Sequence, residues 1–323
     1  MHIGAIIALA AVLVFVVIVG LLSYLVFVKF LRRDAGRQRA EAADFFVRAA
    51  AGSLGERWQG WHEHFERERG WFFGLGGYCD MRIESGGHKL AGHVVDQNAE
   101  ITVIILHGYG GIASSLTSIT DAKAFYETGY NICIPDIRGH GESEGKYFGM
   151  GYVDFADILA WIDNLPGERF VIYGISMGGA VALSVASRGD ARIAAVISDS
   201  TYTSLTEMLP PILKKMLKID FLTKIVTRLG RVWCRIIAGY DFGKDAPIDR
   251  MKYITAPTLI FHGDADTFVP YPMGKTLFNA CAARRKQYHS IPGGTHQDCN
   301  FRYQNQQYIQ VILDFLKEVR NVE

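Results

Sequence analysis

The segment Gly174-Ile175-Ser176-Met177-Gly178 places a serine between two glycines. It follows an apolar run at 170–173 and precedes a run of small residues that favours a helix, so we expect a sharp strand-to-helix turn. Such a turn strains the serine backbone and exposes its hydroxyl, and the flanking glycines avoid steric clashes. The pattern predicts that Ser176 is a nucleophile. The alternative, a serine with no role beyond the turn, is disfavoured by this context.

A serine hydroxyl needs a general base, and the base needs a carboxylate that orients it. For a nucleophile in this kind of turn the chain order is serine, acid, histidine. His296, in a glycine-rich loop that ends the last expected strand, is the best candidate for the base. Asp266 is the preferred acid and Asp264 the alternative, because Asp264 is well placed to bind loop backbone. The remaining competitors for the base are disfavoured by a strand position or by preceding the acid: His289, His140 and His262.

The oxyanion of an acyl-transfer intermediate needs preorganised N–H donors. The backbone N–H of Met177, directly after the nucleophile, is one expected donor. The second is expected from the glycine-rich segment His107-Gly108-Tyr109-Gly110-Gly111, and Tyr109 is our choice. A phosphate-binding loop is disfavoured there, because no Lys followed by Ser or Thr completes the pattern.

Short apolar segments alternate with helical patterns along the rest of the chain. A leading hairpin is expected at 78–84 and 90–95, buried strands at 101–106, 131–135, 170–173, 193–198 and 257–261, and a last strand-like segment at 287–291. Helices are expected near 114–128, 153–164, 178–187, 271–283 and 303–319. Continuous apolar runs suit strands buried on both faces of a parallel sheet. The alternation predicts a doubly wound α/β sheet over residues 78–323.

A long insertion at 201–252 interrupts this alternation of strands and helices. It is rich in Leu, Ile, Met and Lys and contains two adjacent prolines. Connections of this length in a compact domain usually have a function. We expect a helical cap over the active site, and a helical excursion without function is the alternative.

The chain begins with an uncharged apolar run over 3–28, which predicts a transmembrane anchor at 1–30. A cleaved signal peptide is disfavoured, because a charged leading region and a convincing cleavage site are missing. Five basic residues follow the run, which predicts that the remainder of the chain is cytoplasmic: Lys29, Arg32, Arg33, Arg37 and Arg39.

Residues 31–77 are expected to form a juxtamembrane linker helix whose aromatic residues lie at the bilayer interface or pack on the domain. His62 and His64 lack the spacing that places two ligands on one helical face, so we predict no metal, and no other cofactor is indicated. Five scattered cysteines indicate free thiols. A formal charge of +1 without a basic stripe argues against nucleic acid as a partner. The oligomeric state is left open.

Residues 78–319 resemble the α/β-hydrolase superfamily. Five ordered blocks carry the resemblance: His107-Gly108-Tyr109-Gly110, Asp136-Ile137-Arg138-Gly139-His140-Gly141-Glu142-Ser143, Gly174-Ile175-Ser176-Met177-Gly178-Gly179, His262-Gly263-Asp264-Ala265-Asp266-Thr267-Phe268-Val269-Pro270 and Gly294-Thr295-His296. The resemblance implies an eight-stranded, mostly parallel sheet, an oxyanion loop at Tyr109 and a triad of Ser176, Asp266 and His296. Two further blocks resemble the Bem46 and α/β-hydrolase-domain 13 group: Asp199-Ser200-Thr201-Tyr202-Thr203-Ser204 and Gly239-Tyr240-Asp241-Phe242.

The expected activity is the hydrolysis of carboxyl esters or thioesters through an acyl-enzyme. Membrane attachment and the apolar, lysine-bearing insertion favour lipid or other acyl substrates. A serine aminopeptidase or amidase with the same triad is the nearest alternative. A non-catalytic scaffold protein is disfavoured, because all the parts of the machinery are present.

Overall fold

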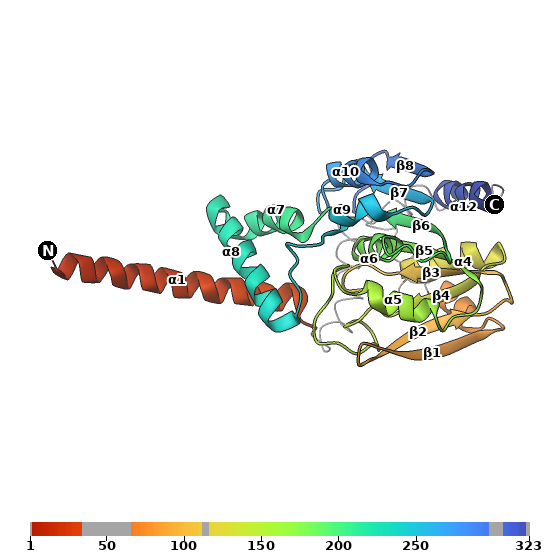
Figure 1. Ribbon diagram of the computed structural model, residues 1–323, viewed down its shortest axis with the longest axis horizontal. Helices are drawn as coiled ribbons and strands as arrows, with labels where there is room; N and C mark the ends of the chain where they lie inside the picture. The colour runs from red at the N-terminus through yellow and green to blue at the C-terminus, as the bar shows by residue number, and fades with distance from the viewer. Residues whose placement is uncertain (1, 34–65, 112–115, 297–305, 321–323) are drawn as a thin grey trace. The chain divides into compact units, whose positions relative to one another are not determined.

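A computed structural model describes residues 2–33, 66–111, 116–296 and 306–320 (Figure 1). The chain divides into two compact units. The first, called here the helical unit, contains Met1–Arg32 and Ser204–Lys244. The second, called the sheet unit, contains Arg33–Thr203 and Asp245–Glu323. The strands and the candidate catalytic residues belong to the sheet unit.

The sheet unit contains an eight-stranded sheet in the order β1-β2-β4-β3-β5-β6-β7-β8. Its strands are β1 (Tyr78–Ser85), β2 (His88–Val95), β3 (Ile101–Leu106), β4 (Asn131–Pro135), β5 (Arg169–Ile175), β6 (Ile193–Asp199), β7 (Thr258–Gly263) and β8 (Lys286–Ile291). The pairs β1–β2 and β2–β4 are antiparallel and the other neighbouring pairs are parallel. The chain leaves β3 for β4 on one side and returns to β5 on the other. The sheet therefore changes direction between the carboxyl ends of β3 and β5, the place where open α/β sheets hold their ligands.

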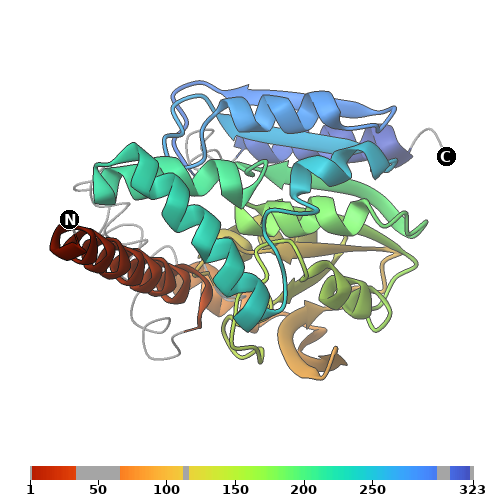
Figure 2. The same ribbon diagram turned by 60° about the vertical axis from the view of Figure 1, so that its left-hand side comes forward.

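Helices cover both faces of the sheet (Figures 1 and 2). They are α4 (Leu116–Glu127), α5 (Phe155–Ile162), α6 (Met177–Ala186), α9 (Pro247–Arg250), α10 (Pro272–Ala280) and α12 (Gln306–Arg320), with a 3₁₀ turn at Met251–Tyr253. α4 and α12 share one hydrophobic cluster with alternate residues of the central strands. α5, α6 and α10 lie on the opposite face (Figure 2). Every residue of β3, β4 and β6 is buried, as expected for strands covered on both sides.

A short helix at 66–73 precedes the sheet. Phe72 is fully buried in the main hydrophobic cluster, and Trp71 and Phe73 pack against it. The sequence predicted that the aromatic residues of this segment lie at the bilayer interface or pack on the domain. These three residues pack on the domain. The expected linker at 31–77, with His62 and His64, lies largely outside the described residues and its boundaries stay a prediction.

The helical unit contains α1 (His2–Leu31), α7 (Leu205–Leu217), α8 (Asp220–Trp233) and a π-helical turn at Cys234–Ala238. Ile3–Leu31 is long and apolar enough to cross a membrane, which makes it a candidate membrane span. Residues 3–18 of α1 are exposed, whereas Val19, Ser23, Phe27 and Leu31 are buried. Their four-residue spacing places them on one face of the helix.

The insertion expected at 201–252 folds into helices, but its compact part is narrower, Ser204–Lys244, and belongs to the helical unit together with α1. The segment after it returns to the sheet unit as α9. The expected role of the insertion as a cap stays a prediction. Elsewhere the expected fold is confirmed, and the strand and helix ends differ from the expected ones by a few residues.

Candidate active site

The turn around Ser176 joins β5 to α6. Ser176 has φ 56° and ψ −113°, a strained backbone for a residue with a side chain. Its N–H donates to the carbonyl of Asp199 over 2.7 Å, which fixes the turn against β6. Gly178 allows the close approach of β3: a Cβ there would lie 2.0 Å from the carbonyl oxygen of Leu106. The glycine thus lets α6 begin directly against the end of β3.

The structure brings Ser176, His296 and Asp266 together in one hydrogen-bonded chain. His296 Nε2 lies 3.1 Å from Ser176 Oγ, and His296 Nδ1 lies 2.8 Å from Asp266 Oδ2. A carboxylate only accepts, so Nδ1 carries the proton and Nε2 faces the serine hydroxyl as an acceptor. This is the arrangement in which an imidazole can remove the hydroxyl proton. The three residues come from the carboxyl ends of β5, β7 and β8.

Asp266 is held as an anion. One carboxylate oxygen accepts the backbone N–H groups of Phe268 and Val269, each over 2.9 Å. The other meets His296 and, at 3.4 Å, Nε2 of His262. Burial raises the pKa of Asp266, but the hydrogen bonds from His262 and His296 outweigh burial and lower its pKa to about 2. The carboxylate is therefore ionised at every physiological pH.

The alternative acid and bases have other positions. Asp264 accepts the N–H of Gly293 over 2.6 Å, which is the backbone role expected for it. His289 lies within β8, and His140 is buried in the loop after β4. His262 is the residue whose contribution sequence reasoning missed: it does not act on Ser176 but contacts the acid from its buried side. Its position four residues before Asp266 was the available signal.

The segment after β3 forms a turn in which Gly111 N–H donates to the carbonyl of Gly108 over 3.0 Å. Tyr109 occupies this turn, and its ring meets Phe148 edge-on. His107 fixes the start of the turn: its Nε2 accepts Ile137 N–H at 3.1 Å, and its Nδ1 contacts the carbonyl of Gly108 at 2.8 Å. Burial lowers the pKa of His107, which favours this neutral form. The oxyanion-hole roles of the Tyr109 and Met177 N–H groups stay a prediction.

A buried tyrosine–carboxylate network lies behind the serine turn. Tyr308 donates to Asp199 over 2.9 Å, Tyr173 donates to Asp121 over 2.9 Å, and the two hydroxyls are 3.1 Å apart. Burial raises the pKa of Tyr173 and Tyr308 well above the usual value, so both hydroxyls remain donors. The network links α12, β5, α4 and β6 beneath the turn.

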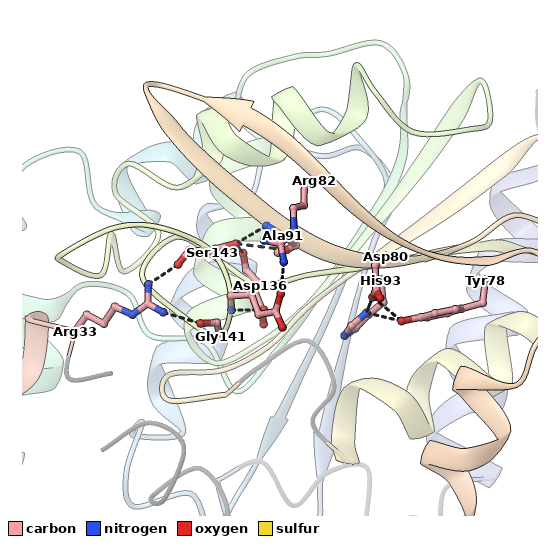
Figure 3. Close-up of polar contacts among 10 residues, drawn as sticks. Arg33, Tyr78, Asp80, Arg82, Ala91, His93, Asp136, Gly141 and Ser143 are labelled. Atoms are coloured by element: carbon pink, nitrogen blue, oxygen red, sulfur yellow. Dashed lines mark hydrogen bonds and ion pairs between the residues drawn. The ribbon is translucent and has the colours of Figure 1, made fainter. Parts of the chain in front are cut away.

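Arg33 contacts the loop after β4 (Figure 3). Its guanidinium donates to the carbonyls of Ser143 over 2.5 Å and Gly141 over 2.6 Å. Ser143 Oγ donates to the carbonyl of Asp136 over 2.6 Å and accepts the N–H of Ala91 over 2.9 Å. From the sequence, Arg33 was identified only as one of five basic residues that follow the apolar run. A contact between residues about 110 positions apart leaves no local signal for it.

Figure 3 also shows a second polar cluster on the hairpin of β1 and β2. Tyr78 donates to Asp80 over 2.6 Å, and His93 Nδ1 lies 2.8 Å from the same carboxylate oxygen. The hydrogen bond from Tyr78 is the main cause that lowers the pKa of Asp80. These contacts pair neighbouring strands across the hairpin. Within the described part of the chain, no group of three or more His, Cys, Asp or Glu residues could hold a metal ion.

Comparisons with known proteins agree with this fold. The family described as alpha/beta hydrolase fold matches residues 101–248, and the serine aminopeptidase family S33 matches residues 236–300. Protein bem46 of Schizosaccharomyces pombe is 30% identical over 223 residues, which cover 67% of each chain. The lysophosphatidylserine lipase ABHD12 of Xenopus tropicalis is 28% identical over 236 residues, which cover 66% of this chain and 57% of that protein.

Among solved structures, the Pyrococcus furiosus esterase Pf2001 aligns with a TM-score of 0.61 at 23% identity, covering 75% of this chain and 92% of the esterase. The sheet and its strand order define an α/β hydrolase. The chain belongs to the α/β-hydrolase fold family, in the Bem46 group.

Proposed function

We propose that this protein is a membrane-anchored serine hydrolase that cleaves carboxyl-ester or thioester bonds of lipid or other acyl substrates. The hydrogen-bonded chain from Ser176 through His296 to Asp266, at 3.1 and 2.8 Å, is the observation that carries the proposal. A strained serine with a base and an ionised carboxylate behind it is suited to acyl transfer.

In the proposed mechanism, His296 Nε2 takes the hydroxyl proton as Ser176 Oγ attacks the substrate carbonyl. The N–H groups of Met177 and Tyr109 stabilise the oxyanion of the tetrahedral intermediate. His296 then gives the proton to the departing alcohol or thiol, and an acyl-Ser176 remains. A water molecule that loses its proton to His296 attacks this acyl group, and the acid is released as the proton returns to Ser176.

A fluorophosphonate probe tests the nucleophile. The full-length protein is expected to be labelled, and Ser176→Ala is expected to lose labelling and at least about a thousandfold of its esterase activity. Ser187→Ala, which changes a serine at the other end of α6, should label like the wild type. Equal labelling of Ser176→Ala, or a folded wild type that does not label, would refute the proposal.

The relatives suggest the substrates to test first. A lysophosphatidylserine lipase among them, and the apolar helix α1, support acyl lipids as substrates. We expect hydrolysis of lysophospholipids, acylglycerols or p-nitrophenyl esters of long acyl chains. A chain-length series measured as kcat/KM defines the acyl specificity.

A serine aminopeptidase is the second candidate, because the S33 serine aminopeptidase family matches residues 236–300. Aminoacyl amides should therefore be measured beside the esters. A higher kcat/KM for the amides would replace the esterase proposal with this one.

A further inference from the structure

The turn between α7 and α8 exposes an unusual combination of side chains. Three apolar side chains there are about half exposed: Met216 (50%), Ile219 (47%) and Phe221 (58%). Three exposed lysines alternate with them: Lys214, Lys215 and Lys218. A single exposed apolar residue is ordinary. Large apolar residues gathered among lysines at a helix end are typical of segments that lie in the membrane interface. We call these six residues the basic tip.

The basic tip belongs to the same compact unit as the candidate membrane span. Trp233, at the end of α8, donates its indole N–H to Ser23 Oγ in α1 over 2.9 Å. The Trp233 ring also meets Tyr24 of α1 edge-on, with centroids 5.4 Å apart. Figure 1 shows α8 crossing α1 near the C-terminal end of α1, and in both views the α7–α8 turn lies on the N-terminal side of that crossing.

The length of α1 sets the level of this crossing in a bilayer. A hydrocarbon core of about 30 Å takes about 20 helical residues. Counted from Ile3, this length ends close to Ser23 and Tyr24, where Trp233 contacts α1. Trp and Tyr side chains favour that boundary. The α7–α8 turn is displaced from this level toward the N-terminus of α1. If α1 spans the bilayer, this displacement brings the turn to the headgroups and the outer acyl chains.

The charge of the segment identifies the kind of lipid. Residues 204–244 contain eight Lys or Arg and three Asp or Glu, a net charge of +5, whereas the whole chain carries +1. Within the basic tip, Lys214 forms an exposed ion pair with Asp220 at 2.9 Å, and Lys215 and Lys218 flank the apolar residues. Such a surface attracts an anionic leaflet.

We propose that the basic tip is a second membrane contact: Met216, Ile219 and Phe221 enter the outer acyl region of the leaflet, and Lys214, Lys215 and Lys218 bind anionic phospholipid headgroups. This inference rests on the membrane anchoring within the proposed function, but not on the hydrolase activity. The tip and α1 then hold the helical unit to the bilayer at two separate points.

Fluorescence quenching by spin-labelled lipids tests the depth of the tip. The full-length protein, with Cys79→Ser and Cys299→Ser as background, receives an environment-sensitive fluorophore at Phe221→Cys, at Ile219→Cys, at Val14→Cys within α1, or at Lys317→Cys on α12. Each variant is placed in phosphatidylcholine vesicles with and without phosphatidylglycerol. Circular dichroism and thermal unfolding check the fold of each variant, independently of any hydrolase activity.

We expect the fluorophore at position 14 to be quenched by deep spin labels, those at 219 and 221 by shallow ones, and that at 317 by neither. Phosphatidylglycerol should strengthen quenching at 221 about twofold, and Lys214→Gln, Lys215→Gln and Lys218→Gln together should remove that gain. Quenching at 14 without quenching at 219 and 221 would overturn the tip and leave the anchor standing. The loss of quenching at 14 as well would refute the anchor too. A fluorophore at 221 that is shielded from lipid but changes when unlabelled protein is added would show that a second copy covers the tip, contrary to our proposal.

Discussion

At the scale of single residues, Asp266 is the most constrained group of the candidate site. Its side chain is fully buried, and it accepts two backbone N–H groups and contacts two histidines. A pKa lowered from 3.8 to about 2 means that the folded protein prefers the ionised form. Asp266 therefore contributes stability above its unfolded pKa, and this contribution is lost as the pH falls toward about 2.

The pH dependence of unfolding checks this contribution. Between pH 5 and pH 2, the free energy of unfolding of the wild type should fall by about 2 kcal/mol more than that of Asp266→Asn, whose amide does not titrate. Chemical denaturation across this range measures both slopes. Parallel slopes would show that the carboxylate is not stabilised as described.

His262 should act as a positioning residue through Asp266. His262 Nε2 hydrogen-bonds the carbonyl of Val269 over 3.0 Å and lies 3.4 Å from Asp266 Oδ2. His262→Phe removes both contacts and weakens the positioning of the buried anion, so we expect kcat to fall about tenfold with little change in KM. The acid-induced loss of stability that comes from Asp266 should also begin at a higher pH, because the pKa of Asp266 rises. His262→Gln, which keeps a donor, should recover part of the loss. If both variants behave alike in every readout, His262 has only a packing role.

At the scale of elements, the junction between β3, β5 and α6 depends on the absence of a side chain at Gly178. A Cβ there would meet two carbonyl oxygens, of Leu106 at 2.0 Å and of His107 at 2.6 Å. By contrast, a Cβ at Gly230 in α8 would meet only Phe242, at 3.9 Å.

These two helical glycines form a matched pair for mutation. We expect Gly178→Ala to lower the stability by about 3 kcal/mol, because rigid backbone must move. Gly230→Ala should raise the stability by up to about 1 kcal/mol, as alanine favours the helix. Thermal unfolding of both variants measures the contrast. A stable Gly178→Ala protein with normal activity would contradict this account of the turn.

The loop after β4 depends on hydrogen bonds from Arg33, which a single substitution can remove. Arg33→Met keeps the long apolar stem but removes both donors to the carbonyls of Gly141 and Ser143. We expect about 1 to 3 kcal/mol less protection of the amides in residues 139–146, measured by hydrogen exchange. Arg32→Met changes an exposed neighbour and serves as the control. Equal exchange in both variants would mean that Arg33 does not hold the loop.

At the scale of the whole molecule, α1 and the residues after it predict the topology. Basic residues gather directly after the apolar run, so we expect the chain beyond α1 to face the cytoplasm. A reporter fused after Glu323 should be active as a cytoplasmic fusion and inactive as an exported one. The opposite pattern would reverse the proposed orientation.

Much of the fold and of the candidate site was predictable from the sequence by itself, because the signals are local. Apolar runs of strand length marked the strands, and Gly174-Ile175-Ser176-Met177-Gly178 marked the turn through its spacing and its place between an apolar run and a run of small residues. Glycines and polar residues at strand ends selected Asp266 and His296, since parallel strands bring their carboxyl ends to one edge. The superfamily resemblance implied that these segments join in one eight-stranded, mostly parallel sheet.

Only the tertiary structure decided the contacts between distant segments. The hydrogen bonds of Arg33 with the loop after β4, of Tyr308 with Asp199 and of Trp233 with Ser23 join residues more than 100 positions apart. Such pairs depend on how helices pack on the sheet and on one another, which no short pattern encodes. Packing also groups the insertion with α1. The alternation of strands and helices in the sequence can show that residues 201–252 are an insertion, but only the packing of the helices decides which element the insertion contacts.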